Sequence, residues 1–132
     1  MNEGLITIAS QFSAKDTIDR LVAKVTSVGL LVFARVDHTA GAKQAGFDLR
    51  PTELLIFGNP RGGTPLMLDK QSAGIDLPVK ALACEDADGK VWLAYNDPAW
   101  IAERHGLMDA SADAVRAMTA GLAMVTKAAA GD

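Results

Sequence analysis

The residues best suited to chemistry lie in the segment 58–65, which reads Gly-Asn-Pro-Arg-Gly-Gly-Thr-Pro. An apolar run over 54–57 precedes it and is typical of a strand that is buried on both faces. Thr64 fits an N-cap and Pro65 a first helical residue, so we expect a helix to begin at Pro65. A glycine corner that leads into a helix start offers an anion backbone N–H groups and the Arg61 guanidinium.

Two interpretations of this segment remain open. A nucleotide-binding P-loop is not among them, because that loop needs lysine directly after its second glycine and this chain has Thr64 after Gly63. The first interpretation is a site for a small anionic ligand, with these binding residues: Asn59, Arg61, Gly62, Gly63 and Thr64. The second is a tight strand-to-helix corner with a solvated arginine.

The pair Asp37-His38 is a second candidate, at the end of an apolar stretch over 30–36. An imidazole oriented by Asp37 or Asn59 would suit a general acid or base, so an enzyme that uses His38 is an alternative function. Adjacent strand residues point to opposite faces, which favours instead a His38 that hydrogen-bonds the next loop. Because His38 and Asn59 both follow apolar strands, we expect that they meet Arg61 in one cleft, with His38 as a further ligand-binding residue.

The sequence predicts no metal site and no cofactor. Two separated histidines, His38 and His105, and the single Cys84 form no metal-ligand pattern. His105 follows Arg104 at a predicted helix end, where cations complement the helix dipole, and we assign it no functional role. Cys84 lies in the middle of a predicted strand and is expected to be a buried or semi-buried core thiol.

Composition limits the class of protein. The 132 residues fit one domain, 1–132, and contents of 49% hydrophobic and 22% charged residues exclude intrinsic disorder. With 13 basic against 16 acidic residues the net charge is −3, which argues against nucleic-acid binding. No apolar run is long enough for a membrane span and the first residues do not resemble a signal peptide, so we expect a cytoplasmic protein without membrane contact.

Periodicity and turn residues predict the elements. β-rich or apolar runs indicate five strands, over 5–8, 30–36, 54–57, 79–85 and 90–96. Helices are expected over 14–28, from 65 to about 72, over 98–105 and over about 111–128, with one or two helical turns within 40–46. The Asp88-Gly89 pair predicts a hairpin between the last two strands, and the tail over 128–132 is expected to fray.

This order of elements favours an α+β fold with a five-stranded, mainly antiparallel sheet. The long helices suffice to cover only one face of such a sheet. Because two strands look apolar on both faces, the uncovered face is expected to meet a second copy of the chain. We therefore predict a homodimer that forms through the sheet.

Several motifs resemble the bacterial domain of unknown function 302 family. They are the stretches 33–38, 50–60, 63–67, 75–78, 80–82 and 95–98. The resemblance covers about 4–107 and leaves out the helix from Ser111. It implies a β-α-β4-α fold with the topology of the TATA-binding protein, usually dimeric, and no established activity. An acidic chain lacks the basic saddle that DNA binding would need.

The sequence thus favours a small-molecule-binding domain with its site at Gly58–Pro65. The His38 enzyme and a structural or partner-binding dimer module are the alternatives. A ligand site needs His38 and Arg61 in one concave pocket, and an enzyme also needs an orienting group for His38. A partner module needs only an exposed apolar patch.

Overall fold

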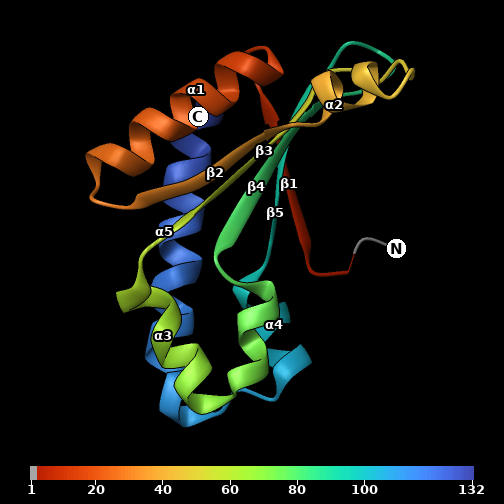
Figure 1. Cartoon of the computed structure of the whole chain (residues 1–132). Helices are drawn as coiled ribbons and strands as arrows, with labels where there is room; N and C mark the ends of the chain where they lie inside the picture. Colours follow the sequence, from red (N-terminus) through yellow and green to blue (C-terminus); the bar gives the residue numbers. More distant parts are fainter. Residues whose placement is uncertain (1–2) are drawn as a thin grey trace.

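A five-stranded antiparallel sheet is the frame of the computed structural model, which describes residues 3–132 (Figure 1). The strand order is β1-β5-β4-β3-β2, and every neighbouring pair runs antiparallel. The strands are β1 (Leu5–Ser10), β2 (Leu31–Asp37), β3 (Thr52–Gly58), β4 (Val79–Glu85) and β5 (Val91–Asn96). The fold is α+β with β-α-β4-α order, as predicted.

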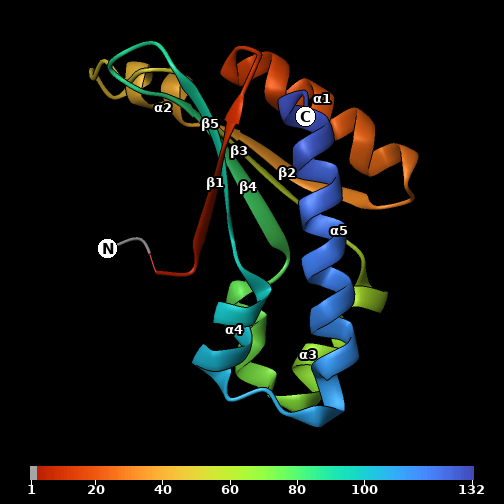
Figure 2. The same cartoon turned by 180° about the vertical axis from the view of Figure 1, so that it is seen from behind.

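Two long and three shorter α-helices accompany the sheet. The α-helices are α1 (Ala14–Ser27), α2 (His38–Gln44), α3 (Pro60–Asp69), α4 (Pro98–His105) and α5 (Ala112–Ala130), and the 3₁₀ segments are η1 (Gln71–Asp76) and η2 (Asp109–Ser111). Helices α1 and α5 lie against the same face of the sheet, and the lower half of α5 runs beside α3 (Figures 1 and 2). Helices α3 and α4 sit together at the end of the sheet far from α2 (Figure 2).

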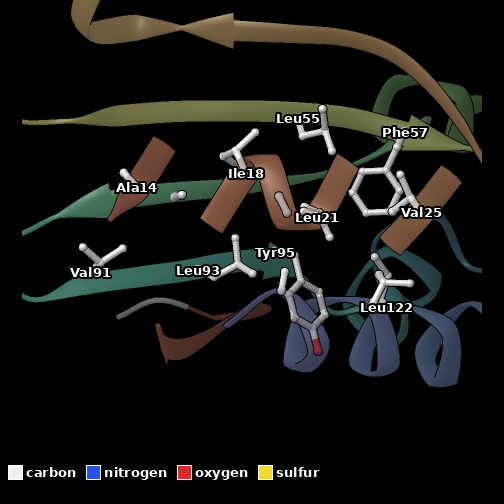
Figure 3. Close-up of a cluster of buried hydrophobic side chains, with 14 residues drawn as sticks. Ala14, Ile18, Leu21, Val25, Leu55, Phe57, Val91, Leu93, Tyr95 and Leu122 are labelled. Atoms are coloured by element: carbon white, nitrogen blue, oxygen red, sulfur yellow. The ribbon is translucent and has the colours of Figure 1, made fainter. Parts of the chain in front are cut away.

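The core lies between the sheet and these two long helices. Ser13 caps α1 by accepting a hydrogen bond from the N–H of Asp16, and the apolar positions of α1 recur at helical spacing. The helix therefore turns one stripe of side chains onto the sheet. Figure 3 shows this stripe packed against alternate residues of β3 and β5 and against Leu122 of α5. The buried side chains include Ile18, Leu21, Val25, Leu55, Phe57, Leu93 and Tyr95.

The opposite face of the sheet carries no long helix within the described residues (Figures 1 and 2). Strand pairing places Leu54 opposite both Val36 and Leu82 on this face, and Ile56 opposite Ala34. All of these side chains are only half-buried. We call this surface the open sheet face, and it consists of Leu5, Thr7, Ala9, Ala34, Val36, Thr52, Leu54, Ile56, Lys80, Leu82, Cys84, Trp92, Ala94 and Asn96.

Two local predictions differ from the structure. Helix α3 begins at Pro60 instead of Pro65, because Asn59 caps it and Pro60 takes the first helical position. Pro65 then lies inside the helix. The chain end does not fray at 128, because α5 continues to Ala130 and the Arg20 side chain hydrogen-bonds its last carbonyls.

Candidate functional site

A cavity of about 430 Å³ opens between α3, the lower half of α5 and the adjoining ends of β2, β3 and β4. The segment from Gly58 to Thr64 forms one side of it. The remaining wall is almost wholly apolar and consists of Leu30, Phe33, Phe57, Met67, Leu77, Pro78, Val79, Ala114, Ala117, Met118, Gly121, Leu122 and Val125. The predicted site segment therefore borders a hollow suited to an apolar group.

The backbone of this segment is fixed by local hydrogen bonds. Gly58 ends β3 with φ +151°, a conformation that favours glycine. Asn59 Oδ1 accepts a hydrogen bond from the N–H of Arg61 at 2.8 Å. The carbonyl of Asn59 accepts from the N–H groups of Gly62 and Gly63, at 2.9 and 3.1 Å. The backbone donors that we expected to face an anion are thus already paired inside the protein.

The polar part of the cavity is consequently made by side chains. Arg61 and Thr64 are both exposed and both line the cavity. Within residues 3–132 no carboxylate pairs with Arg61. Arg61 is the second residue of α3, at the positive end of the helix dipole. Among the residues that line the cavity, Arg61 is the one whose guanidinium can bind a carboxylate or phosphate in a bidentate manner.

Small residues keep the cavity open on both helical walls. A Cβ added to Gly62 or Gly121 would meet no atom within 4 Å, and one added to Gly63 would make only an ordinary contact with Leu77. These three glycines have no positive φ, so the backbone does not require them. Ala117 completes the small-residue wall on α5. The role of these glycines is therefore to leave the cavity unfilled, since larger side chains would occupy it.

His38 does not join this site, and the predicted cleft with Asn59 and Arg61 is wrong. Strands β2 and β3 are antiparallel, and Asp37 pairs with Glu53 while Leu31 pairs with Gly58. The end of β2 is therefore about 20 Å from the end of β3. Two consecutive strands that both end in polar residues bring those ends together only if they are parallel.

Asp37 caps the helix that follows it and does not orient His38. Its Oδ1 accepts a hydrogen bond from the N–H of Ala40 at 2.9 Å, which makes Asp37 the N-cap of α2. His38 is the exposed first residue of that helix. The structure therefore gives His38 no orienting carboxylate from Asp37, and Asn59 is too distant to serve.

A polar cluster that the sequence did not reveal joins η1 to α4. His105 Nε2 lies 2.6 Å from Asp76 Oδ2, and His105 Nδ1 lies 2.8 Å from Ser72 Oγ. Arg104 Nη1 contacts both carboxylate oxygens of Asp76, at 3.0 and 3.2 Å. The i, i+4 spacing of Ser72 and Asp76 was the available signal, but only the packing of η1 on α4 brings His105 between them.

The described residues include no candidate metal site and no helix that could span a membrane. No group of three or more histidine, cysteine, aspartate or glutamate side chains within 3–132 is placed to hold a metal ion. In the same range, no helix has both the length and the apolar character to cross a bilayer. Cys84 is half-buried on the open sheet face, and burial raises the pKa of its thiol.

Curated relatives resemble the whole chain. The chain is 57% identical over 132 residues to "Fluoride-specific ion channel FluC 1" of Brucella suis biovar 1 (strain 1330), covering all of this chain and 52% of that protein. A protein of the same name from Brucella abortus biovar 1 (strain 9-941) is also 57% identical, with 49% of it covered. The chain thus spans about half the length of the curated relatives it matches.

A solved structure has the same fold at low identity. The crystal structure of an uncharacterized conserved DUF302 protein from Bacillus stearothermophilus superposes with a TM-score of 0.84 at 18% identity, covering 96% of this chain and 98% of that one. The family model "Domain of unknown function DUF302" matches residues 6–125, so the family includes most of α5, beyond the expected limit near 107. The chain belongs to the DUF302 family.

Proposed function

We propose that this domain binds a small amphipathic anion, with its apolar body in the cavity and its acidic group at Arg61. The observation that carries the proposal is the apolar cavity of about 430 Å³. Pockets of about 300–1,000 Å³ with mostly apolar walls and few polar groups are typical small-molecule sites. Glycine inside a helix costs roughly 0.5–1 kcal/mol relative to alanine. Gly62 and Gly121 therefore lower stability where larger residues would fill the cavity.

Arg61 supports an acidic group on the ligand. Its side chain borders the cavity and has no carboxylate partner within the described residues. A guanidinium binds carboxylate or phosphate through two parallel hydrogen bonds, and the nearby N-terminus of α3 favours negative charge. The ligand would thus be an acid whose carbon skeleton lies against residues such as Phe57 and Met118.

Fluoride itself does not suit the cavity. The matched relatives are named as fluoride-specific ion channels, and the chain matches about half of each. A small, strongly hydrated anion loses more by desolvation in an apolar cavity than one arginine at its edge returns. We propose a ligand-binding role for this domain that is separate from ion passage. The cytoplasmic location inferred from the sequence stays a prediction.

A thermal-shift series tests the role of Arg61. Wild type, Arg61→Ala and the exposed control Arg116→Ala are each melted with straight-chain carboxylates, the matching alcohols, phosphate and fluoride. Ligands that bind only the native state raise the melting temperature by mass action. We expect carboxylates to stabilise the wild type most. Arg61→Ala should weaken carboxylate binding about 10- to 100-fold, the equivalent of about 1.5–3 kcal/mol for a charged hydrogen bond, and leave alcohols unchanged.

Two results would contradict this assignment. One is a wild type that no carboxylate or alcohol stabilises. The other is an equal effect of Arg61→Ala on the acid and the alcohol of each pair. A shift with fluoride alone would assign the domain to the ion instead of to an amphipathic acid.

We also propose that two copies associate through the open sheet face. Lys80 is the only charged side chain among the strand residues of this face, and Leu54, Ile56 and Leu82 form its centre. Five strands about 20 Å long and 4.8 Å apart give a face of about 500 Å² per protomer. Two such faces together bury about 1,000 Å², at the lower limit for a specific interface, so we expect a weak dimer.

Sedimentation across a concentration series tests the dimer. Leu82→Lys places a charge at the centre of the open sheet face, whereas Leu68→Lys changes a leucine that is 82% exposed on α3. We expect wild type and Leu68→Lys to dimerise at roughly 10–100 μM, and Leu82→Lys to stay monomeric, since an interface burying about 1,000 Å² is at the weak end. A wild type that is monomeric at all these concentrations, or equal association of both variants, would refute the interface.

A further inference from the structure

The polar cluster of η1 and α4 is separate from the cavity. None of Ser72, Asp76, Arg104 and His105 lines the cavity wall. The His105 side chain is 7% exposed and that of Asp76 is 11% exposed, whereas Ser72 is an exposed residue. A carboxylate and an imidazole thus lie inside, and the hydroxyl that they lead to lies at the surface. A purely structural link between η1 and α4 would need only the buried Asp76 and His105, and not the exposed Ser72.

The hydrogen bonds fix which nitrogen of His105 carries the proton. The Asp76 carboxylate is held by Arg104 and can only accept, so His105 Nε2 donates to its Oδ2. In a neutral imidazole the other nitrogen, Nδ1, is then an acceptor. It faces the Ser72 hydroxyl at 2.8 Å. This is the order of a nucleophile, a base and an orienting carboxylate, with the two ring nitrogens exchanged relative to the usual serine hydrolase.

We propose that Ser72 is an acyl-accepting nucleophile that hydrolyses small activated esters, with His105 as its general base and Asp76 as a positioning residue. Ser72 Oγ attacks the ester carbonyl carbon while its proton passes to His105 Nδ1. The bond from that carbon to the leaving oxygen breaks, and the leaving oxygen takes the proton from Nδ1. Water then attacks the acyl-serine by the same route, so ester and water give acid and alcohol.

The surroundings of Ser72 indicate small substrates. Ile75 follows Ser72 by three residues in a 3₁₀ helix, where such positions align, and it is 73% exposed. It offers an apolar contact for a short acyl chain beside the hydroxyl. This surface is open, so we expect little selectivity for the acyl chain and a high KM.

Labelling with a fluorophosphonate, followed by mass spectrometry of the modified serine, tests the proposal on the full chain. Ser27 is the matched control, because it is also exposed and its hydroxyl donates to the carbonyl of Lys24 instead of to an imidazole. A general base contributes about 10²–10⁴-fold. We expect Ser72 to be labelled at least about 100-fold faster than Ser27, with a pH dependence that Ser27 lacks.

Variants separate chemistry from folding. Ser72→Ala should abolish both the labelling and the turnover of p-nitrophenyl acetate, and His105→Gln should reduce labelling of Ser72 to the rate of Ser27. Asp76→Asn should flatten the pH dependence of Ser72 labelling, because the variant side chain no longer fixes the tautomer of the His105 ring.

If His105→Gln does not fold, a second variant tests the role of His105 instead, namely Ser72→Cys in a Cys84→Ala background. The thiol that this variant places beside a basic imidazole should be alkylated faster at low pH than free cysteine. Equal labelling of Ser72 and Ser27, or an unaltered alkylation rate, would overturn the proposal.

Discussion

Individual aspartates accept hydrogen bonds that hold loops and turns of this domain in place, and Asp86 in the β4–β5 turn is the clearest case. Its Oδ2 accepts a hydrogen bond from Trp92 Nε1 at 3.0 Å, and its Oδ1 accepts from the N–H groups of Lys90 and Asp88, both at 2.9 Å. The bond from Trp92, then that from Lys90, lowers the pKa of Asp86 below 3.8. The indole of Trp92 thus makes this carboxylate a structural acceptor within the β4–β5 hairpin.

This shift predicts how stability depends on pH. A carboxyl whose pKa is lowered on folding contributes stability above its unfolded pKa, and loses it as pH falls through the folded pKa. We expect Asp86→Asn to be less stable than wild type by a constant amount above about pH 5. That difference should shrink below pH 3.8. Urea unfolding from about pH 3 to 7 measures it, and Asp88→Asn is the control in the same turn. A difference that does not change with pH would contradict this role.

At the level of elements, the end of α5 depends on α1. Arg20 donates from Nε to the carbonyl of Ala129 and from Nη2 to that of Ala128, both at 3.0 Å. Its guanidinium also stacks on the Phe12 ring at 4.1 Å. Ala129 is fully buried beneath these contacts. The last turn of α5 is thus tied to α1 by a residue that lies 109 positions before Ala129.

Removing this contact should loosen the end of α5. Arg20→Ala loses two charge-assisted hydrogen bonds at a partly exposed site, and we expect a loss of about 1–2 kcal/mol in the free energy of unfolding. Arg116→Ala, which breaks an exposed pair with Asp113 in the same helix, should cost less than about 0.5 kcal/mol. Hydrogen exchange over 124–130 should quicken only in Arg20→Ala. Equal effects of the two variants would contradict the docking role of Arg20.

Short-range signals in the sequence predicted most of the helices and turns correctly. Caps and turns act within a few residues, so the helices predicted over 14–28 and 98–105 and the hairpin predicted at Asp88-Gly89 agree with α1, α4 and the β4–β5 turn. Ser13 and Asp97 are the N-caps of these two helices. Asn59-Pro60 has the same cap-and-proline signature, but the glycines after it suggested a corner and placed the start of α3 too late.

Tertiary arrangement could not be predicted in this way. The antiparallel pairing of β2 with β3 separates His38 from Asn59, and no local signal fixes it. The contact between His105 and Asp76 likewise depends on how two distant elements pack. The predicted site residues between Asn59 and Thr64 are close together along the chain, and all of them line the cavity. His38 could have joined them only through a different strand pairing, and it does not.

At the scale of the whole molecule, the domain has one filled core and one hollow end. The sheet, α1 and the upper half of α5 enclose well-packed side chains (Figure 3). The lower half of α5 and α3 instead face each other across small residues and leave the cavity. Close-packed interiors are the rule in proteins. A hollow bordered by Arg61, which has no carboxylate partner in the described part of the chain, is therefore the main support for a ligand in this fold.

A side chain that fills this cavity from within the protein is the most direct test of ligand binding there. In Gly121→Leu the new side chain enters the cavity without a backbone clash, and the helix gains stability by losing a glycine. Gly41→Leu makes the same change on α2, where a Cβ also meets nothing and where Gly41 does not line the cavity beside α3 and α5. Both variants are expected to fold.

Calorimetric titration of wild type, Gly121→Leu and Gly41→Leu with a medium-chain carboxylate such as decanoate is the decisive measurement. We predict one site in wild type and in Gly41→Leu, and binding at least about tenfold weaker in Gly121→Leu, a difference of about 1.4 kcal/mol or more. Equal affinity in all three proteins, or no binding to the wild type, would contradict a ligand site in the cavity.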